Sequence, residues 1–447
     1  MDVFVIEGGR KLSGTVRING SKNAALPLMA AALLTDEALI LDDVPNLSDI
    51  RNMTKLLSEL GVLSTHDTSA GTGQSITHRV TDPSQSHARY EIVRTMRASI
   101  STLGPLLAKR GHARVSLPGG CAIGQRPVDL HLRGLEALGA IITLDGGDII
   151  ASAPGGGRLI GAPVFLGGPF GSTVLGTANI LSAATLAHGT TTIESAACEP
   201  EIVDLANMLI AMGAKISGAG SPRIIIEGVE ELGGTTHRVM PDRIEAGTYM
   251  CASAITNSEL VLENCPLDAM MSAVETLKHM GIYVTPQGDD SDPMRRSCTM
   301  TRDETQLIKP VQITTQPHPG FPTDLQAQFM ALLCLSDGNS VITEKIFPER
   351  FLHVAELCRM GAQIHRQGAT AVVTGVARLA GAPVMASDLR ASAGLVIAGL
   401  AAQGQTVINR VYHIDRGYEH MEDTLASVGA SIRRANAEEF ADSAMSL

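Results

Sequence analysis

The stretch EALGAIITL, residues 136–144, shows the pattern on which the whole chain is built: the end of a helix, a glycine, then an alternating strand. Glycine at this point suits the left-handed conformation that ends many helices before a strand. Five similar phrases occur elsewhere: SELGVLST, IAMGAKIS, KHMGIYVT, CRMGAQIH and ASVGASIR. The glycines stand 78, 74, 68, 80 and 68 residues apart, at Gly61, Gly139, Gly213, Gly281, Gly361 and Gly429. This even spacing predicts six structural repeats.

A second phrase alternates with the first: an alanine-rich helix, a polar turn and a strand, as in residues 178–196 and 395–412. Together the two phrases make strand-helix-strand-helix units of roughly 74 residues that fill the chain. Three units in each half predict two similar α/β domains with helices inside and sheets outside. Small alanine side chains fit this arrangement because they let helices approach closely.

Length and charge narrow the class of protein. A chain of 447 residues is too long for one core, which favours two domains. The net charge of -11 repels nucleic acid and anionic lipid, so neither is an expected partner. Seven scattered cysteines without a CxxC, no apolar signal core and no membrane-length apolar run predict reduced thiols in a cytoplasmic protein.

The segment PGGCAIGQRPVDL, residues 118–130, is the first candidate for chemistry. Three glycines around Cys121 predict a flexible loop, and Pro127 suits the first position of a helix with Asp129 in its first turn. A helix start and the nearby Arg126 both favour a thiolate. The alternative is a small apolar residue in a loop. Because the flanking glycines leave Cys121 little to pack against, the functional interpretation is preferred.

The segment NGSKNAALP, residues 19–27, predicts a turn followed by a helix. Pro27 is expected in the first turn of that helix, where its missing N–H costs nothing. Lys22 would then stand at a helix entrance, a good place to meet an anion. A solvated surface lysine is an equally open interpretation.

Three arginines follow a common pattern. Arg97 in TMRAS and Arg390 in SDLRASA stand before alanine- and serine-containing helices of different repeats, and Arg416 lies in HIDRG. Arginine forks bind carboxylate and phosphate oxygens in pairs. Salt bridges to Asp388 and Asp415 are the alternative. Taken together, the three predict one anion pocket.

The segment QPHPGFPTDLQAQ, residues 316–328, begins with a proline-rich loop and places Asp324 at the start of the helix that follows. A helix N-cap is the ordinary role for such an aspartate, and a positioned general base is the more specific one. Elsewhere the chain has no GxxxxGK[ST], no strand–GxGxxG–helix unit, no HExxH and no metal-ligand spacing. No cofactor and no metal are therefore expected.

These segments resemble the UDP-N-acetylglucosamine enolpyruvyl transferases, of the EPSP synthase-like superfamily. The matching motifs run in the family's order along nearly the whole chain: SKNAALP, TMRAS, PGGCAIGQRPVDLHL, EPEIVD, PDRIEAGT, FPTDLQAQF, ERF-H, SDLRASA and YHIDRGYE. The resemblance implies two inside-out α/β barrel domains of three repeats each, with the active site in the cleft between them. We expect one domain over residues 21–240, the other over 1–20 plus 241–435, and a tail over 436–447.

The resemblance also implies the reaction and the role of each residue. The enolpyruvyl group of phosphoenolpyruvate would move to the 3-hydroxyl of UDP-N-acetylglucosamine, the first committed step of peptidoglycan precursor synthesis. Cys121 would act as an acid, Asp324 as the base, and Lys22 would take part in both binding and catalysis. Residues implied at phosphoenolpyruvate are Lys22, Asn23, Arg97, Arg126, Arg390 and Arg416. Residues implied at the UDP-sugar are Asn23, Arg97, Arg126, Pro127, Val128, Asp129, Leu130, His131, Thr173, Val174, Asp324 and Ile346.

Two segments depart from the family pattern. The diphosphate loop reads GSTVLGT, residues 171–177, which places Thr173 where the family has serine and Leu175 where it has glycine. Residues 287–306 match poorly and are expected to form a surface excursion. Two alternatives to the implied function are enolpyruvyl transfer to shikimate 3-phosphate and a catalytically inactive UDP-sugar-binding paralogue. Enolpyruvyl transferases that act on shikimate 3-phosphate lack the Gly-Gly-Cys loop that this chain has. Retention of Lys22, Cys121, Asp324 and Arg416 argues against an inactive paralogue.

Overall fold

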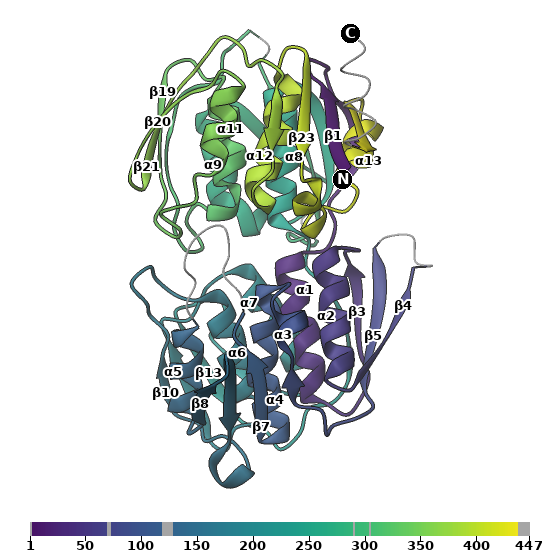
Figure 1. Ribbon diagram of the computed structural model, residues 1–447, viewed down its shortest axis with the longest axis vertical. Coiled ribbons are helices and arrows are strands. Elements are labelled where there is room, and N and C mark those ends of the chain that lie inside the picture. Colours follow the sequence, from purple (N-terminus) through teal and green to yellow (C-terminus); the bar gives the residue numbers. More distant parts are fainter. Residues whose placement is uncertain (1, 69–72, 119–127, 289–290, 304, 437–447) are drawn as a thin grey trace. The chain divides into compact units, whose positions relative to one another are not determined.

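The computed structural model describes residues 2–436 except 69–72, 119–127, 289–290 and 304 (Figure 1). The described residues form two compact units. We call residues from Gly20 to Met240 the first unit, and residues up to Asn19 together with those from Pro241 onward the second unit. No helix in the described part of the chain is long and apolar enough to cross a membrane.

The first unit contains three four-stranded sheets among its described residues. In order across each sheet, the strands are β14 (Thr235–Arg238), β3 (Leu39–Val44), β5 (Gln74–Val80) and β4 (Val62–Asp67); β6 (His87–Ala88), β7 (His112–Ser116), β9 (Asp148–Ser152) and β8 (Ile141–Asp145); and β10 (Pro163–Phe165), β11 (Thr190–Glu194), β13 (Arg223–Glu227) and β12 (Lys215–Ser217).

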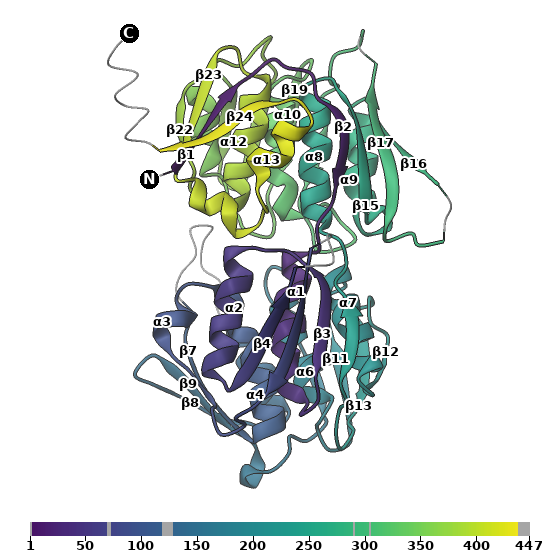
Figure 2. The same ribbon diagram turned by 90° about the vertical axis from the view of Figure 1, so that its right-hand side faces the viewer.

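The second unit repeats this plan with three further sheets. They are β2 (Ser13–Arg17), β15 (Glu259–Cys265), β17 (Arg296–Arg302) and β16 (Ile282–Gln287); β18 (Gln312–Thr314), β19 (Asn339–Thr343), β21 (Thr370–Thr374) and β20 (Gln363–Gln367); and β22 (Pro383–Met385), β23 (Gln405–Asn409), β1 (Asp2–Glu7) and β24 (Ser431–Asn436). The first strand of the chain thus pairs with the last described one, as Figure 2 shows.

All six sheets have the same pairing pattern, which confirms the six predicted repeats. Each begins with one parallel pair, such as β6 with β7, and continues with antiparallel pairs, such as β7 with β9 and β9 with β8. The six repeat glycines all have positive φ, from 78° at Gly61 to 107° at Gly213. A side chain would be strained there, so glycine sets where each helix ends.

Inner helices form the core of each unit, with the sheets around them (Figures 1 and 2). In the second unit α8 and α10 are buried along their whole length. Helices α8, α10 and α12 pack on one another, and α6 packs against both α1 and α4 in the first unit. This confirms the predicted α/β class. The inner helices are α1 (Lys22–Ala30), α4 (Leu103–Arg110), α6 (Val174–Ala184), α8 (Arg243–Ile255), α10 (Gln326–Leu333) and α12 (Leu389–Ala401).

The outer helices are amphipathic and each leads into one of the repeat glycines. In α2 the buried side chains Ile50, Met53 and Leu57 lie on one face, as a half-buried helix requires. These helices are α2 (Ser48–Glu59), α5 (Asp129–Ala137), α7 (Pro200–Ala211), α9 (Met271–His279), α11 (His353–Arg359) and α13 (Met421–Ser427). Shorter turns are α3 (Tyr90–Val93), η1 (Ala31–Leu34), η2 (Arg97–Thr102), η3 (Pro154–Gly156), η4 (Leu267–Met270), η5 (Thr323–Leu325) and η6 (Val411–Arg416).

Two local expectations were wrong. Pro27 lies in the second turn of α1, not the first. Because α1 is buried along almost its whole length, packing outweighs the hydrogen bond that proline removes. Residues 287–306 are not simply a surface excursion, because Arg296–Arg302 form β17, between β15 and β16, with Cys298 and Met300 buried.

Candidate functional site

The residues predicted for the site divide between the two units. The first unit carries Lys22, Asn23, Arg97, Thr173, Val174 and the segment 128–131; the second carries Asp324, Ile346, Arg390 and Arg416. Cys121, Arg126 and Pro127 lie outside the described residues. Each unit therefore holds its own group of predicted site residues.

Lys22 is the first residue of α1, as predicted, and only 8% of its surface is exposed. Its Nζ lies 3.2 Å from Oδ2 of Asp49, which is buried in the first turn of α2. The Oγ of Ser21 caps α1 by accepting a hydrogen bond from the Ala24 N–H. The lysine is therefore held in place and is not a solvated surface side chain. Together with the positive end of α1, it suits an anion.

The other predicted residues of the first unit stand where helices begin. Arg97 opens η2, Asp129 opens α5, and Thr173 is the N-cap of α6, accepting a hydrogen bond from the Gly176 N–H at 3.2 Å. The threonine hydroxyl thus caps this helix as a serine hydroxyl would. Helix α6 packs against η2 and α5. These helix starts therefore lie on elements in direct contact, and backbone N–H groups at such positions bind phosphate well.

Asp324 in the second unit lies in η5, and its carboxylate is held by two arginines. Arg350 Nη1 donates to Oδ1 at 2.7 Å, while Arg390 Nε and Nη2 lie 3.2 and 3.1 Å from Oδ2. Both guanidinium groups are buried, whereas 27% of the Asp324 side chain remains exposed. Asp324 lies inside η5, and η5 and α10 both begin without a side-chain cap. The N-cap interpretation is therefore wrong.

Arg390 makes its ion pair with Asp324 and not with Asp388. Asp388 instead caps α12, accepting hydrogen bonds from the backbone N–H groups of Arg390 and Ala391. Burial opposes the charge of Arg390, but the Asp324 carboxylate raises the arginine pKa above its usual value. Tyr418 completes the contact, with its Oη 3.3 Å from Arg390 Nη1.

The loop around Asp324 is braced by a buried carboxylate, that of Glu344. Glu344 accepts hydrogen bonds from Thr315 Oγ1 at 2.6 Å and from Thr323 Oγ1 at 2.9 Å. The backbone N–H of Ile346 also donates to Glu344, at 2.8 Å. Ile346, which was predicted to bind the UDP-sugar, is thus tied through Glu344 to Thr323, the residue that precedes Asp324.

Arg416 ends η6, and its neighbour Asp415 pairs with Arg434 at 2.5 Å. Asp415 is therefore engaged elsewhere in the second unit. Burial and the charge of Arg416 lower the pKa of His413, a residue of the same short helix.

Arg350 lies in the matching motif ERF-H, but the resemblance gave it no role. It lies 26 residues after Asp324, in a loop, where arginine is common. Only the folded chain brings the two together.

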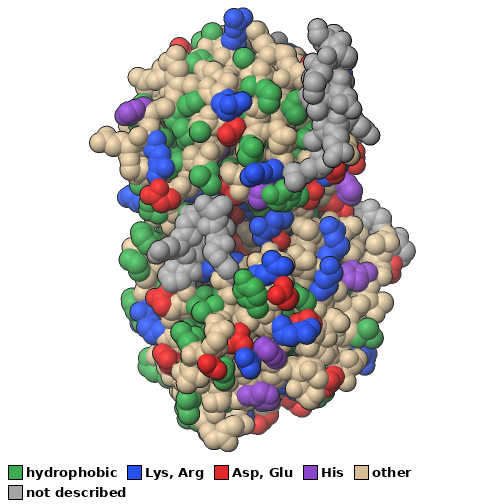
Figure 3. Space-filling model, viewed as in Figure 1, with side chains coloured by type: hydrophobic (Ala, Val, Ile, Leu, Met, Phe, Trp, Pro, Cys, Tyr) green, Lys and Arg blue, Asp and Glu red, His purple; other side chains and the backbone are tan. Residues whose placement is uncertain are grey.

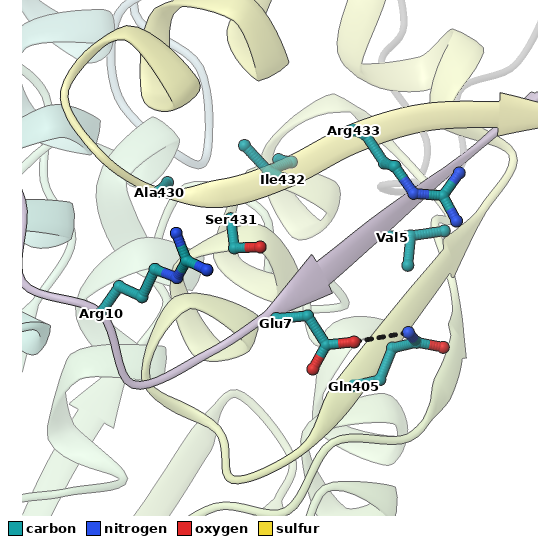
Figure 4. Close-up of a pocket in the computed structure, with 8 residues that line it drawn as sticks. All are labelled: Val5, Glu7, Arg10, Gln405, Ala430, Ser431, Ile432 and Arg433. Atoms are coloured by element: carbon teal, nitrogen blue, oxygen red, sulfur yellow. Dashed lines mark hydrogen bonds between the residues drawn. The ribbon is translucent and has the colours of Figure 1, made fainter.

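A separate pocket of about 270 Å³ lies on the sheet formed by β22, β23, β1 and β24 (Figure 4). Gln405 Nε2 donates to Glu7 Oε1 at 2.5 Å in its wall. None of the predicted site residues lines it. On the face in Figure 3, basic and acidic side chains are interspersed, so any anion site must be local.

The chain matches the model of a known family and closely related sequences. Residues 6–425 match the family described as EPSP synthase (3-phosphoshikimate 1-carboxyvinyltransferase). A protein from Desulfovibrio desulfuricans named UDP-N-acetylglucosamine 1-carboxyvinyltransferase is 53% identical over 434 residues, covering 97% of this chain and 99% of that protein. A protein of the same name from Nitrobacter hamburgensis is 52% identical over 439 residues, with 97% and 99% covered.

Solved structures show the same fold. The enolpyruvyl transferase NikO from Streptomyces tendae superposes with a TM-score of 0.86 at 24% identity, covering 98% of this chain and 99% of that one. An EPSP synthase from Acinetobacter baumannii gives a TM-score of 0.75 at 19% identity, with 98% and 100% covered. The fold is thus shared with proteins of low sequence identity.

Proposed function

The chain belongs to the UDP-N-acetylglucosamine 1-carboxyvinyltransferases within the EPSP synthase family, and we propose that it transfers the enolpyruvyl group of phosphoenolpyruvate to the 3-hydroxyl of UDP-N-acetylglucosamine. Phosphate is the second product. The observation that carries this proposal is the 53% identity over 97% of the chain. We further propose that the two units correspond to the two domains expected from the repeats.

Asp324 is the base in this proposal. It takes the proton of the sugar 3-hydroxyl as that oxygen attacks C2 of phosphoenolpyruvate, while Cys121 gives a proton to C3. Loss of a proton from the new methyl group and departure of phosphate then form the enol ether. The exposed part of the Asp324 carboxylate supports this role, because a base must reach its proton. The part of Cys121 rests on family resemblance.

The cations bind the anionic substrate. Lys22, Arg126 and Arg416 hold the phosphate and carboxylate of phosphoenolpyruvate, with Arg97 and Arg390 beside them. Burial of Lys22 supports this assignment, because a desolvated cation attracts an anion more strongly than a solvated one. Arg390 has a second role, since it also binds the base.

The UDP-sugar is held by Asn23, Asp324 and Ile346 and by helix starts of the first unit. Val128, Asp129, Leu130 and His131 contact it at α5, with Arg126 and Pro127 before them, and Arg97, Thr173 and Val174 contact it at η2 and α6. Backbone N–H groups at the start of α6 can bind the diphosphate without the family's usual serine and glycine.

The substrates also suggest a setting. Phosphoenolpyruvate and nucleotide sugars are made in the cytoplasm, so we place the enzyme there. Its product is the first committed precursor of peptidoglycan.

Phosphate release separates the possible functions. With phosphoenolpyruvate present, we expect release on adding UDP-N-acetylglucosamine and none on adding shikimate 3-phosphate. The opposite preference would assign the chain to the shikimate branch. Tight UDP-sugar binding by calorimetry, without phosphate release, would indicate an inactive UDP-sugar-binding paralogue.

A further inference from the structure

Asn179 lies at the centre of the inner helices of the first unit and is completely buried on α6. We infer that Asn179 is a positioning residue: its amide holds η2, α4 and α5 against α6 and fixes His131 as the tautomer protonated on Nε2. The inference rests on the proposed function, because it assigns these elements to the UDP-sugar site. It adds a residue to which the sequence comparison gave no role.

The three contacts of the Asn179 amide go to three different elements. Its Oδ1 accepts a hydrogen bond from the Gly104 N–H of α4 at 2.7 Å. Its Nδ2 donates to the Ile100 carbonyl of η2 at 2.8 Å, and lies 2.9 Å from Nδ1 of His131 on α5. A side-chain amide has two N–H donors, so both are used.

These partners determine which end of the amide is oxygen. A backbone N–H can only donate and a backbone carbonyl can only accept, so Gly104 and Ile100 admit one orientation of Asn179. The atom facing His131 Nδ1 is then the amide nitrogen, which donates. Nδ1 must accept, and a neutral imidazole with an accepting Nδ1 carries its proton on Nε2.

Close packing leaves these elements little freedom to move. A Cβ added at Gly104 would lie 2.3 Å from the Asn179 carbonyl oxygen, so α4 and α6 touch through their backbones. A Cβ at Gly134 of α5 would lie 2.7 Å from Ile180 Cδ1 on α6. The hydrogen bonds of Asn179 therefore lie between two tight helix contacts, where a small shift is passed on.

Three of the four elements joined by the amide, η2, α5 and α6, carry residues assigned to the substrate. Arg97 opens η2, the segment 128–131 spans the start of α5, and Thr173 caps the helix of Asn179 itself. A helix start shifted by a fraction of an ångström moves every backbone N–H aimed at a phosphate. Asn179 is therefore expected to affect sugar binding without touching the sugar.

The first test is the state of His131 in the wild-type enzyme, by nitrogen-15 NMR of labelled histidine at pH 7.5. The Asn179 geometry predicts a neutral ring with a protonated Nε2. The His131 signals are assigned by their loss in His131→Gln. A ring protonated on Nδ1, or on both nitrogens, would overturn the inference. This measurement needs neither turnover nor a variant of Asn179.

The second test replaces the amide by a carboxylate in Asn179→Asp, which cannot donate to Ile100 or His131. We expect the KM for UDP-N-acetylglucosamine to rise on the order of tenfold, with a smaller change in kcat, because buried hydrogen bonds are lost. His131 should become protonated on Nδ1. A folded variant with the wild-type sugar KM would overturn the inference.

A matched control is Thr185→Val at the end of the same helix. Thr185 is also fully buried, but its Oγ1 donates only within the helix end, to Ser182 O at 2.7 Å. It should lower the melting temperature and leave the sugar KM unchanged; an equal KM increase would show that any destabilisation suffices and would overturn the inference. Absence of wild-type turnover would count against the proposed function alone, because the nitrogen shifts report on Asn179 independently.

Discussion

Apart from Lys22, which pairs with Asp49, the two units hold their predicted site residues by different forces. In the first unit the residues stand at helix starts, and neutral contacts such as those of Asn179 set where the helices lie. In the second unit a carboxylate, Asp324, is fixed by the charges of Arg350 and Arg390. A neutral buried bond depends on packing, whereas an ion pair depends on keeping both charges. Substitutions should therefore affect the two groups in different ways.

The largest effect is expected at the charged group of the second unit. Asp324→Asn should lower turnover by about 10²–10⁴-fold, the usual loss for a general base. UDP-sugar binding, measured by calorimetry, should be largely kept, since the amide can still accept a hydrogen bond. The control is Asp148→Asn, which breaks a similar pair with Arg114 at 2.6 Å in a sheet of the first unit. If both variants lose turnover equally, the loss comes from breaking a buried ion pair, and Asp324 is not the general base.

The second-largest effect is expected on replacing Lys22, which forms an ion pair in the first unit. Lys22→Ala leaves Asp49 buried without this cation, and should lower kcat/KM for phosphoenolpyruvate about 10²-fold or more. Calorimetry with UDP-N-acetylglucosamine alone should show a much smaller change. Lys109→Ala is the matched control, because Lys109 pairs with the exposed Asp36 and surface pairs contribute little. If Lys22→Ala weakens UDP-N-acetylglucosamine binding more than it lowers kcat/KM for phosphoenolpyruvate, Lys22 does not belong to the anion pocket.

A smaller change in kcat is expected on replacing Arg350, which tests how the base is held. Arg350→Met should reduce kcat about tenfold, because Asp324 loses one charge-assisted hydrogen bond. Arg350→Lys should recover part of that loss, since it keeps the charge but not the fork shape. If kcat rises in Arg350→Met, the arginine restrains the base by lowering its proton affinity and does not aid it by positioning.

The smallest effect should be the same in both units. Burial is the main cause that lowers the pKa of His78 in the first unit and of His353 in the second to about 4. Below the unfolded pKa of about 6.5 the unfolded chain binds more protons, so acid lowers stability as pH falls toward 4. Each histidine should contribute a loss of about 1 kcal/mol between pH 8 and pH 6.

Denaturant unfolding at both pH values tests this expectation. The pH dependence should be smaller in His78→Gln and in His353→Gln, because glutamine does not titrate. The exposed His279, on the surface of α9, provides the control variant His279→Gln. An unchanged pH dependence in both buried variants would show that neither histidine is neutral in the folded protein.

Several site features could be predicted from neighbouring residues alone. Lys22 begins a helix because an Asn-Gly turn and the serine before it favour a helix start there. Arg390 and Asp324 were both expected at the site, although their direct ion pair was not. Arg350 was part of the matching motif ERF-H but received no role, and Asn179 went unrecognised, because arginine in a loop and asparagine in an alanine-rich helix do not by themselves indicate a partner.

The sequence by itself determined the repeat architecture. Glycine is the residue that tolerates positive φ without strain. The six evenly spaced repeat glycines therefore mark six helix ends, and this signal can be found without knowing how the helices pack. The tertiary structure alone decided the partners of Asp324 and the orientation of the Asn179 amide. Those choices depend on charges and backbone groups far apart along the chain, which meet only when helices pack. Local conformational preference is encoded residue by residue, whereas a buried polar contact exists only between elements already in place.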